Sequence, residues 1–554
     1  MQWRMLLAIA LSFLVFYLYQ VLFVPTKPIK RKGEESRVAQ KQTTLQEKGG
    51  SPLKELKMPV QRPALPYRAQ SGRIITVSTP LYIVQFSEKG AAIRSFRLKK
   101  YREYLEGNSP LKEVVHAQNK DVRSVGIDFL EKSISGLDRA VFMANTEKTR
   151  IEAREERKQL VFSWESPEHG VNILKKFTFH PKSYIIDLEV KVRNFSRKTI
   201  QDNLIVVLRK SLRSGQNSTY VFTGPAALID GRLEEIKIKD KNPGTEKAYS
   251  GVITWTGFKD RYFMSALIPD KAQKAGIRLL AQAKDILELN YISPATSIPA
   301  MNEQSYLFHL YFGPQSLETL TKIGFSLAKA INFGWFDIIA KPLLHFMIIM
   351  NRIFKNYGLT IILITILIKI LFWPLSNKSY QSMHQMKKLQ PRIAEIREKY
   401  KHDKKLMNQE MMNLYRVYKV NPLAGCLPMI LQIPIFFALY KVLYQAIELR
   451  HAPFVWWIND LSAPDRLFRF NFAIPFMQPP YGIPVLTIIM GASMFLQQKM
   501  SPPPGDPTQA KVMMFMPLFF TVIFINFPSG LVLYWLVNNI LSIAQQYYVN
   551  KRFV

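Results

Sequence analysis

One lysine lies inside a long apolar run, and its type and setting suggest the clearest chemistry in this 554-residue sequence. Lys369 follows Thr365-Ile366-Leu367-Ile368 in a run over residues 357–375 that contains no Asp or Glu. If the run is a membrane-spanning helix, a rise of about 1.5 Å per residue puts Lys369 roughly 9 Å from its C-terminal end. An ionisable residue at that depth is expensive, and by default it is a candidate functional residue.

Two interpretations of Lys369 stay open. Its ammonium could extend along the helix to the membrane surface, as long basic side chains do near helix ends. It could instead face a wet cavity between helices, where a buried cation is tolerated and attracts acidic groups from outside the protein. Amide and hydroxyl groups within the apolar runs favour the cavity. They belong to Thr365, Gln432, Gln497, Asn538 and Asn539.

The sequence lacks the residues that catalysis, metal binding or cofactor binding would require. The single cysteine, Cys426, cannot form an intramolecular disulfide or a cysteine-based metal site. The sequence shows no Gly-rich phosphate loop and no paired carboxylates, and its scattered histidines fit surface or core positions better than ligand positions. We therefore expect no catalytic residue, no metal site and no cofactor, and we expect that the chain is not an enzyme.

The basic composition points to a membrane rather than to nucleic acid. Lys and Arg number 75 against 41 Asp and Glu, the formal net charge is +34, and 48% of the residues are apolar. Many basic residues fall in residues 27–62 and 378–419, beside long apolar runs. This arrangement is typical of membrane proteins oriented by their charges. No zinc-finger, homeodomain or RNA-binding signature is visible, so no direct nucleic-acid recognition is expected.

The chain divides into a short N-terminal region and two folded regions. Residues 1–25 hold an apolar run long enough to span a bilayer, without a cleavage site after it, and predict a transmembrane anchor. Residues 26–72 are polar and poor in aromatics, which predicts a disordered tether. Short alternating apolar runs over residues 73–315 predict an all-β sandwich.

Residues 316–356 predict an amphipathic helix and a lead-in to the membrane region. Leu320, Ile323, Leu327 and Ile331 fall on one helical face. That face could lie in the membrane interface or pack against the sandwich, and both interpretations stay open. A run at residues 338–350 is interrupted by polar residues and proline, so we expect it to lie at the interface.

Residues 357–554 predict a five-helix membrane core. The candidate spans are residues 357–375, 422–446, 481–498, 513–527 and 531–548. The positive-inside rule places the basic loop at residues 376–420 in the cytoplasm, together with both termini, and the sandwich outside. One observation disagrees, because the predicted tether is itself basic. The predicted fold class is a polytopic α-helical membrane protein with an N-terminal anchor, a five-helix core and a periplasmic all-β sandwich domain.

The basic loop carries two amphipathic stripes that predict a cytoplasmic helical hairpin. The natural interpretation is that the two helices pack along their own seam. Methionine also permits contacts with varied apolar partners, because its thioether side chain is flexible and polarisable. The candidate contact residues are Met383, Met386, Met407 and Met411.

Several motifs resemble the YidC family of membrane protein insertases. Residues 421–428, Asn-Pro-Leu-Ala-Gly-Cys-Leu-Pro, and residues 432–440, Gln-Ile-Pro-Ile-Phe-Phe-Ala-Leu-Tyr, are similar to the third span of that family. Trp-Pro-Leu at residues 373–375 and Phe-Pro-Ser-Gly-Leu-Val-Leu-Tyr at residues 527–534 agree with it. The whole layout resembles Gram-negative members, which have a large periplasmic domain.

The resemblance implies a hydrophilic groove that is open to the cytoplasm and to the inner leaflet. Thr365, Gln432 and Trp535 match groove positions, and Lys369 stands where family members typically carry Arg. Lysine keeps the charge but lacks the planar fork that clamps a carboxylate with two hydrogen bonds. With Asn538 and Asn539, these residues make up the predicted substrate groove.

The resemblance also implies an insertase and folding chaperone in the bacterial inner membrane. It would move short hydrophilic tails through the groove and release apolar segments into the lipid. The implied partners are nascent membrane proteins, the Sec translocon, the ribosome or signal recognition particle receptor, and the phospholipid bilayer. The alternative is a small-solute transporter or channel, for which we expect repeat symmetry or broken helices and find neither. An outer-face sugar enzyme would need an acid/base pair that we cannot assemble.

Overall fold

The computed structural model describes residues 72–105, 107–116, 122–211, 221–237, 243–283, 286–418, 420, 427–500 and 507–553. The predicted anchor at residues 1–25, nearly all of the predicted tether, and the motif at residues 421–426 lie outside the described residues. The chain forms two compact units, and the boundary between them falls between Ile331 and Asn332.

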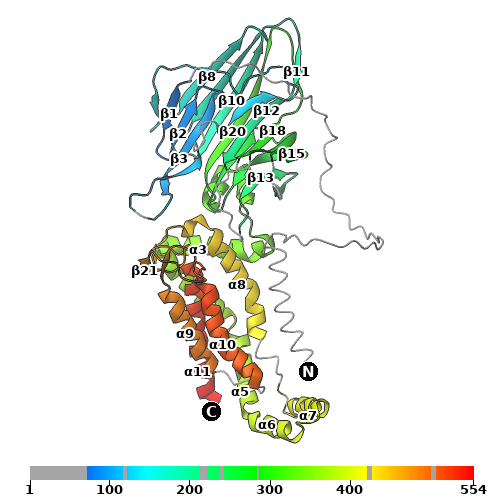
Figure 1. Ribbon diagram of the computed structural model, residues 1–554, viewed down its shortest axis with the longest axis vertical. Coiled ribbons are helices and arrows are strands. Elements are labelled where there is room, and N and C mark those ends of the chain that lie inside the picture. The colour runs from blue at the N-terminus through cyan, green and yellow to red at the C-terminus, as the bar shows by residue number, and fades with distance from the viewer. Residues whose placement is uncertain are drawn as a thin grey trace, which may run out of the picture. The chain divides into compact units, whose positions relative to one another are not determined.

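The first unit is a β-sandwich, as the alternating runs predict (Figure 1). Its smaller sheet has the order β4-β3-β2-β1-β7, and β1 and β7 are parallel. The strands are β1 Ile74–Ser78, β2 Tyr82–Ser87, β3 Ala92–Arg102, β4 Leu111–Val115 and β7 Arg150–Glu152.

The larger sheet has the order β5-β12-β18-β17-β15-β16-β20-β10-β9-β8-β6, with β13 and β14 attached beside β15. Its strands are β5 Gly126–Phe129, β6 Met143–Ala144, β8 Lys158–Ser166, β9 Val171–Phe179, β10 Ile185–Asn194, β12 Leu204–Ser211, β13 Gly224–Ile229, β14 Arg232–Glu235, β15 Glu246–Lys259, β16 Phe263–Pro269, β17 Gln273–Ala283, β18 Ile286–Ile292 and β20 Asn302–Pro314. A separate pair joins β11 Ile200–Asp202 to β19 Thr296–Ile298.

Aromatic side chains from both sheets fill the space between them. Phe86 of β2 contacts Phe177 of β9 with ring centroids 4.6 Å apart, and Phe96 of β3 stacks on Phe312 of β20 at 4.8 Å. Strict alternation along β9 places every second residue inside. One inward position is occupied by Lys175, which is fully buried.

Lys175 binds main-chain carbonyl groups instead of an acid. Its Nζ donates to the oxygens of Gly90 at 3.2 Å, Ala91 at 2.7 Å and Val125 at 2.8 Å. The amine therefore ties β9 of the larger sheet to the turn before β3 of the smaller one. Three acceptors satisfy the three ammonium donors, which is how a buried polar group is tolerated.

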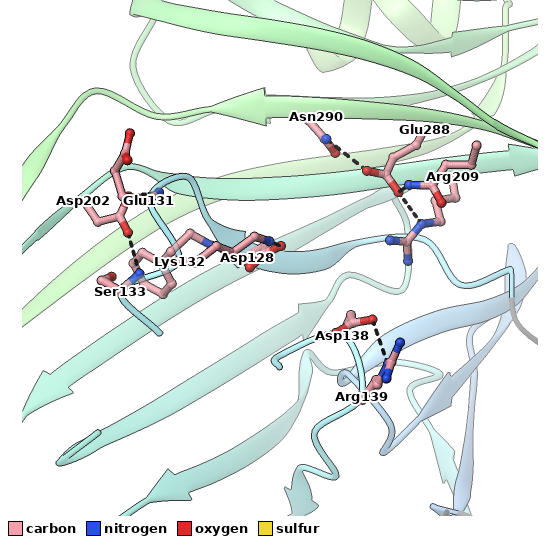
Figure 2. Close-up of polar contacts among 12 residues, drawn as sticks. Asp128, Glu131, Lys132, Ser133, Asp138, Arg139, Asp202, Arg209, Glu288 and Asn290 are labelled. Atoms are coloured by element: carbon pink, nitrogen blue, oxygen red, sulfur yellow. Dashed lines mark hydrogen bonds and ion pairs between the residues drawn. The ribbon is translucent and has the colours of Figure 1, made fainter. Parts of the chain in front are cut away.

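Carboxylates hold the other end of the larger sheet, as Figure 2 shows. Asp202 accepts hydrogen bonds from the backbone nitrogens of Glu131 at 2.9 Å and Ser133 at 3.1 Å. Arg209 of β12 pairs with Glu288 of β18 at 2.7 Å. These contacts fix the loop after β5 and the register of two neighbouring strands.

The segment after β20 is less helical than expected. The helix predicted over residues 316–332 ends at α2 Leu317–Ile323, because Gly324 adopts a φ of 89° and Phe325 and Ser326 are also left-handed. A short 3₁₀ turn, η1 Leu327–Ala330, follows. Lys259 donates to the carbonyl of Ala330 at 2.8 Å, so this segment packs within the β-unit.

The second unit is helical (Figure 1). Each of the five apolar runs contains a helix, and residues 338–350, the predicted interfacial lead-in, lie within a helix, α3. The elements are η2 Gly334–Phe336, α3 Asp337–Phe354, α4 Tyr357–Leu371, α5 Trp373–Lys388, α6 Gln390–Lys399, α7 Lys404–Val417, α8 Leu427–Gln445, η3 Ile447–Leu449, β21 Leu467–Phe470, β22 Tyr481–Ile483, α9 Val485–Met500, α10 Pro507–Phe524 and α11 Ser529–Phe553. Within the described residues no helix taken singly is both long and apolar enough for a membrane span, whereas α4 and α5 satisfy the criterion together across a 65° bend.

The loop at residues 376–420 is a helical hairpin whose first arm is broken. Pro391 is the second residue of α6, and it interrupts the hydrogen bonding that would continue α5, since proline has no backbone N–H to donate. The buried residues Leu389, Ile393, Met411 and Val420 form a small core between the arms. The described part of the hairpin therefore packs along its own seam.

Candidate functional site

A polar cluster joins α4 and α11 in the helical unit. Lys369 of α4 donates from Nζ to the Ser542 Oγ of α11 at 2.7 Å. Ser542 in turn donates to the Asn538 carbonyl one turn earlier, at 2.7 Å. Lys369 is half-buried and Ser542 is 3% exposed. The ammonium therefore points at a neighbouring helix, although it lies close to the end of its own.

Gln432 connects α8 to the same face of α11. Its Nε2 donates to the Asn538 Oδ1 at 2.9 Å and to the Tyr534 hydroxyl at 3.1 Å. The structure thus brings together Lys369, Gln432 and Asn538, three of the predicted groove residues. Helices α4, α8, α9, α10 and α11 contain no Asp or Glu, so the positive charge has no acidic partner within these helices.

The other predicted groove residues make different contacts. Thr365 is buried and donates to the Ile361 carbonyl of its own helix at 2.7 Å. Asn539 turns towards α9, where it donates to the Ser493 Oγ at 3.0 Å. Trp535 packs edge-on against Phe436 of α8 with centroids 4.9 Å apart, within an aromatic cluster that also includes α10. These three residues flank the cluster of Lys369.

Sequence reasoning missed three partners of the predicted residues. Ser542, Tyr534 and Ser493 each hydrogen-bond one of them. A signal for two of the three was present, because Tyr534, Asn538 and Ser542 recur every four residues and so lie on one face of α11. Lys441, which lies within α8, was also passed over among the charges of the apolar runs.

Two glycines mark close packing at the N-terminal ends of α4 and α11. Gly358 at the start of α4 lies so close to the Phe454 ring that a Cβ would overlap it. Gly530 at the start of α11 contacts Leu461, and a Cβ there would approach the Leu461 carbonyl to 3.1 Å and Ile361 to 3.2 Å. Lys369 lies near the other end of α4, and Asn538 and Ser542 lie near the middle of α11.

A small pocket lies where α5, α9 and α11 meet. The buried Gln546 Oε1 and His384 Nε2 have no hydrogen-bond partner in the described part of the chain. Such groups usually bind water. The pocket is lined by Tyr380, Met383, His384, Lys387, Met500, Gln546 and Asn550.

The four candidate methionines of the hairpin do not share one surface. Met383 lines the pocket just described. Met411 is buried in the hairpin core and Met386 packs against it, while Met407 is half-buried on the same arm as Met411. Packing therefore accounts for Met386 and Met411.

Comparisons with known proteins identify the family. The family model described as 60Kd inner membrane protein matches residues 349–554, and the YidC periplasmic domain model matches residues 74–346. The Membrane protein insertase YidC of Syntrophobacter fumaroxidans is 44% identical over 480 residues, covering 86% of each chain. That of Syntrophus aciditrophicus is 40% identical over 564 residues, covering 99% of each chain.

A solved structure of an active YidC insertase with its first transmembrane domain resolved is also similar. It is 17% identical, with a TM-score of 0.38, and the match covers 86% of this chain and 95% of that one. The full-length matches to the curated relatives confirm the family that the motifs suggested. The chain belongs to the YidC family of membrane protein insertases.

Proposed function

We propose that this chain inserts small membrane proteins by holding a hydrophilic tail in a polar groove beside Lys369. The observation that carries the proposal is the position of the Lys369 ammonium. It is 2.7 Å from Ser542 on another helix, among helices without carboxylates. A cation placed in this way attracts an acidic group that a substrate brings.

The physical obstacle to insertion is passage rather than final stability. Each Leu, Ile, Phe or Val at a helix centre gains about 0.3 to 0.6 kcal/mol, whereas Asp, Lys or Arg costs about 2.5 to 3.5 kcal/mol. A short tail with two or three charges therefore faces a barrier similar in size to the gain from a whole apolar segment. A polar groove that reaches partway across the bilayer lowers this barrier, and no nucleotide is required.

Hydration of the groove is supported by the polar groups around Lys369. Gln432, Asn538 and Ser542 line the contact between helices, and the partnerless oxygen of Gln546 lies near them in sequence on α11. The alternative position, with the lysine extended to the membrane surface, would leave Ser542 without this hydrogen bond. The contact observed favours the cavity.

The lipid-exposed sides of α8 and α10 offer a route of release for the apolar segment. Both helices expose large apolar side chains, among them Leu431, Ile433, Phe515, Leu518 and Phe519.

We further propose that the basic hairpin binds the ribosome or the signal recognition particle receptor. The Sec translocon would cooperate on larger substrates, whose folding the chain chaperones. The same proposal includes the N-terminal anchor, five core spans, cytoplasmic termini and a periplasmic sandwich. Full-length relatives named insertases give the transporter alternative no support.

Replacing the charge tests the proposal. Lys369→Ala should reduce insertion of a small substrate with an acidic outward tail and should spare the same substrate with a neutral tail. Lys369→Arg, which keeps the charge, should insert both. Insertion is measured by protease protection of the tail in membrane vesicles with matched protein levels. Equal insertion of the acidic tail by Lys369→Ala and the unmodified chain would count against the role of the charge.

A further inference from the structure

The loop between α8 and α9, residues 446–484, exposes an unusual number of aromatic side chains. Trp456 is 84% exposed, Phe468 69%, Phe472 63% and Phe476 80%. Side chains of this size are normally buried or placed at an interface, because their exposed apolar area is costly in water. Trp456 stacks on Trp457 and Phe472 on Phe470, but all four rings leave most of their surface exposed.

Three of the four residues also have a left-handed backbone. The φ angles are 52° for Trp456, 50° for Phe468 and 64° for Phe476. For a bulky residue this conformation is an outlier, with a steric cost that glycine would avoid. The strain is not offset by burial of the rings in this chain. A contact outside the chain would explain why aromatic residues occupy these positions.

Hydrogen bonds fix the backbone of this loop in one conformation. Arg466 donates to the carbonyls of Pro480 and Ile525, each at 2.8 Å. Asn526 donates to the Phe476 carbonyl at 2.7 Å and accepts from the Gln478 nitrogen at 2.8 Å. These bonds connect the loop to the residues between α10 and α11. The exposed rings are therefore presented by a backbone that is fixed on both sides.

We propose that this loop is a membrane-interface anchor whose aromatic rings insert at the boundary between lipid headgroups and acyl chains. It joins two apolar helices, and the Ser529 nitrogen at the start of α11 donates to the Ala463 carbonyl at 2.7 Å. The loop thus lies at the level where the apolar helices begin and end. Tryptophan and other amphipathic or apolar rings are favoured at that depth. The partner is lipid, and the inference does not depend on the role of Lys369.

Photo-crosslinking in lipid nanodiscs tests the anchor in the full chain. The aromatic crosslinker p-benzoylphenylalanine is placed at Phe468 or Phe476 in turn, which preserves an aromatic ring. Met301 in the β-unit is the matched control, because it is 73% exposed and also left-handed, with a φ of 58°. Lipid adducts at the two loop positions should exceed those at Met301 several-fold. Equal yields at all three positions, or protein adducts replacing lipid adducts in native membranes, would overturn the proposal.

A second measurement needs no crosslinker. Trp456→Phe keeps an aromatic ring, so the difference in fluorescence between the unmodified chain and this variant reports Trp456. Lipids brominated near the headgroup end of the acyl chain should quench that difference more strongly than lipids brominated near the chain end. A difference signal that neither lipid quenches would place Trp456 in water and refute the anchor.

Discussion

Ser542 is the hydrogen-bond partner of the Lys369 ammonium on α11. Its hydroxyl accepts from the ammonium at 2.7 Å and donates to its own helix, so it is oriented before a substrate arrives. The hydroxyl of Tyr380 on α5 also hydrogen-bonds Ser542. In the groove that we propose, Ser542 would position the charge of Lys369 without contacting the substrate.

Ser542→Ala should weaken insertion of an acidic tail less severely than Lys369→Ala does. The ammonium keeps its charge but loses a hydrogen bond, and hydrogen bonds to charged groups contribute about 1.5–3 kcal/mol. Ser542→Thr restores the hydroxyl and should restore insertion. Ser493→Ala is the matched control, since Ser493 binds Asn539 and not Lys369. Comparing acidic and neutral tails in the vesicle assay distinguishes positioning from general damage, which would lower both equally.

Lys175 makes the stability of the β-unit depend on pH. Burial lowers the pKa of Lys175 from 10.5 to about 7. Between these two values the unfolded chain binds a proton that the folded chain has released, so the free energy of unfolding rises with pH, by at most about 1.4 kcal/mol per pH unit. Below pH 7 both states hold the proton and this contribution is constant.

Urea unfolding of the full chain, followed by near-ultraviolet circular dichroism at several pH values, checks this expectation. Lys175→Met removes the amine, and its stability should lose the rise above pH 7. A parallel pH dependence in the two proteins would contradict the assignment. The variant also tests the three carbonyl contacts, because Gly90, Ala91 and Val125 then lose their common donor.

The helical hairpin is stabilised by a small apolar core of its own between α6 and α7. Met411 is 6% exposed between α6 and α7, while its neighbour Met412 is 43% exposed. Met411→Ala should open a cavity costing about 2–5 kcal/mol, whereas Met412→Ala should be nearly neutral. Limited trypsin digestion reports the difference, because the hairpin is rich in Lys and Arg. Equal cleavage rates in the two variants would mean that the seam does not stabilise the hairpin.

Periodicity predicted the elements better than it predicted their ends. The alternation in β9 and the apolar runs of α8 and α11 were readable, because burial repeats every two residues in a strand and the apolar runs are long. The helix end after Ile323 had a signal in Gly324, which caps it, whereas the left-handed conformations of Phe325 and Ser326 could not be predicted from their residue types. Likewise Lys369 could be selected as a charge in an apolar run, whereas its partner Ser542 depended on the contact between α4 and α11.

The orientation of the whole molecule can be tested with one reagent. In a Cys426→Ser background, Met301→Cys lies on the β-unit and Met412→Cys on the hairpin, and both parent side chains are exposed. A membrane-impermeant maleimide applied to spheroplasts should label position 301 alone, because the positive-inside rule keeps the basic hairpin in the cytoplasm. After lysis both positions should react. Labelling of position 412 in intact spheroplasts would reverse the proposed topology.

The contacts of Gly358 and Gly530 lie at the N-terminal ends of α4 and α11, whereas Lys369 lies near the C-terminal end of α4 and Ser542 near the middle of α11. If the groove that we propose ends at these close glycine contacts, it offers ions no continuous path across the membrane. Such a groove would stay accessible from one side without dissipating the electrochemical gradients of the cell. It would then need no moving gate and no energy-consuming cycle of opening.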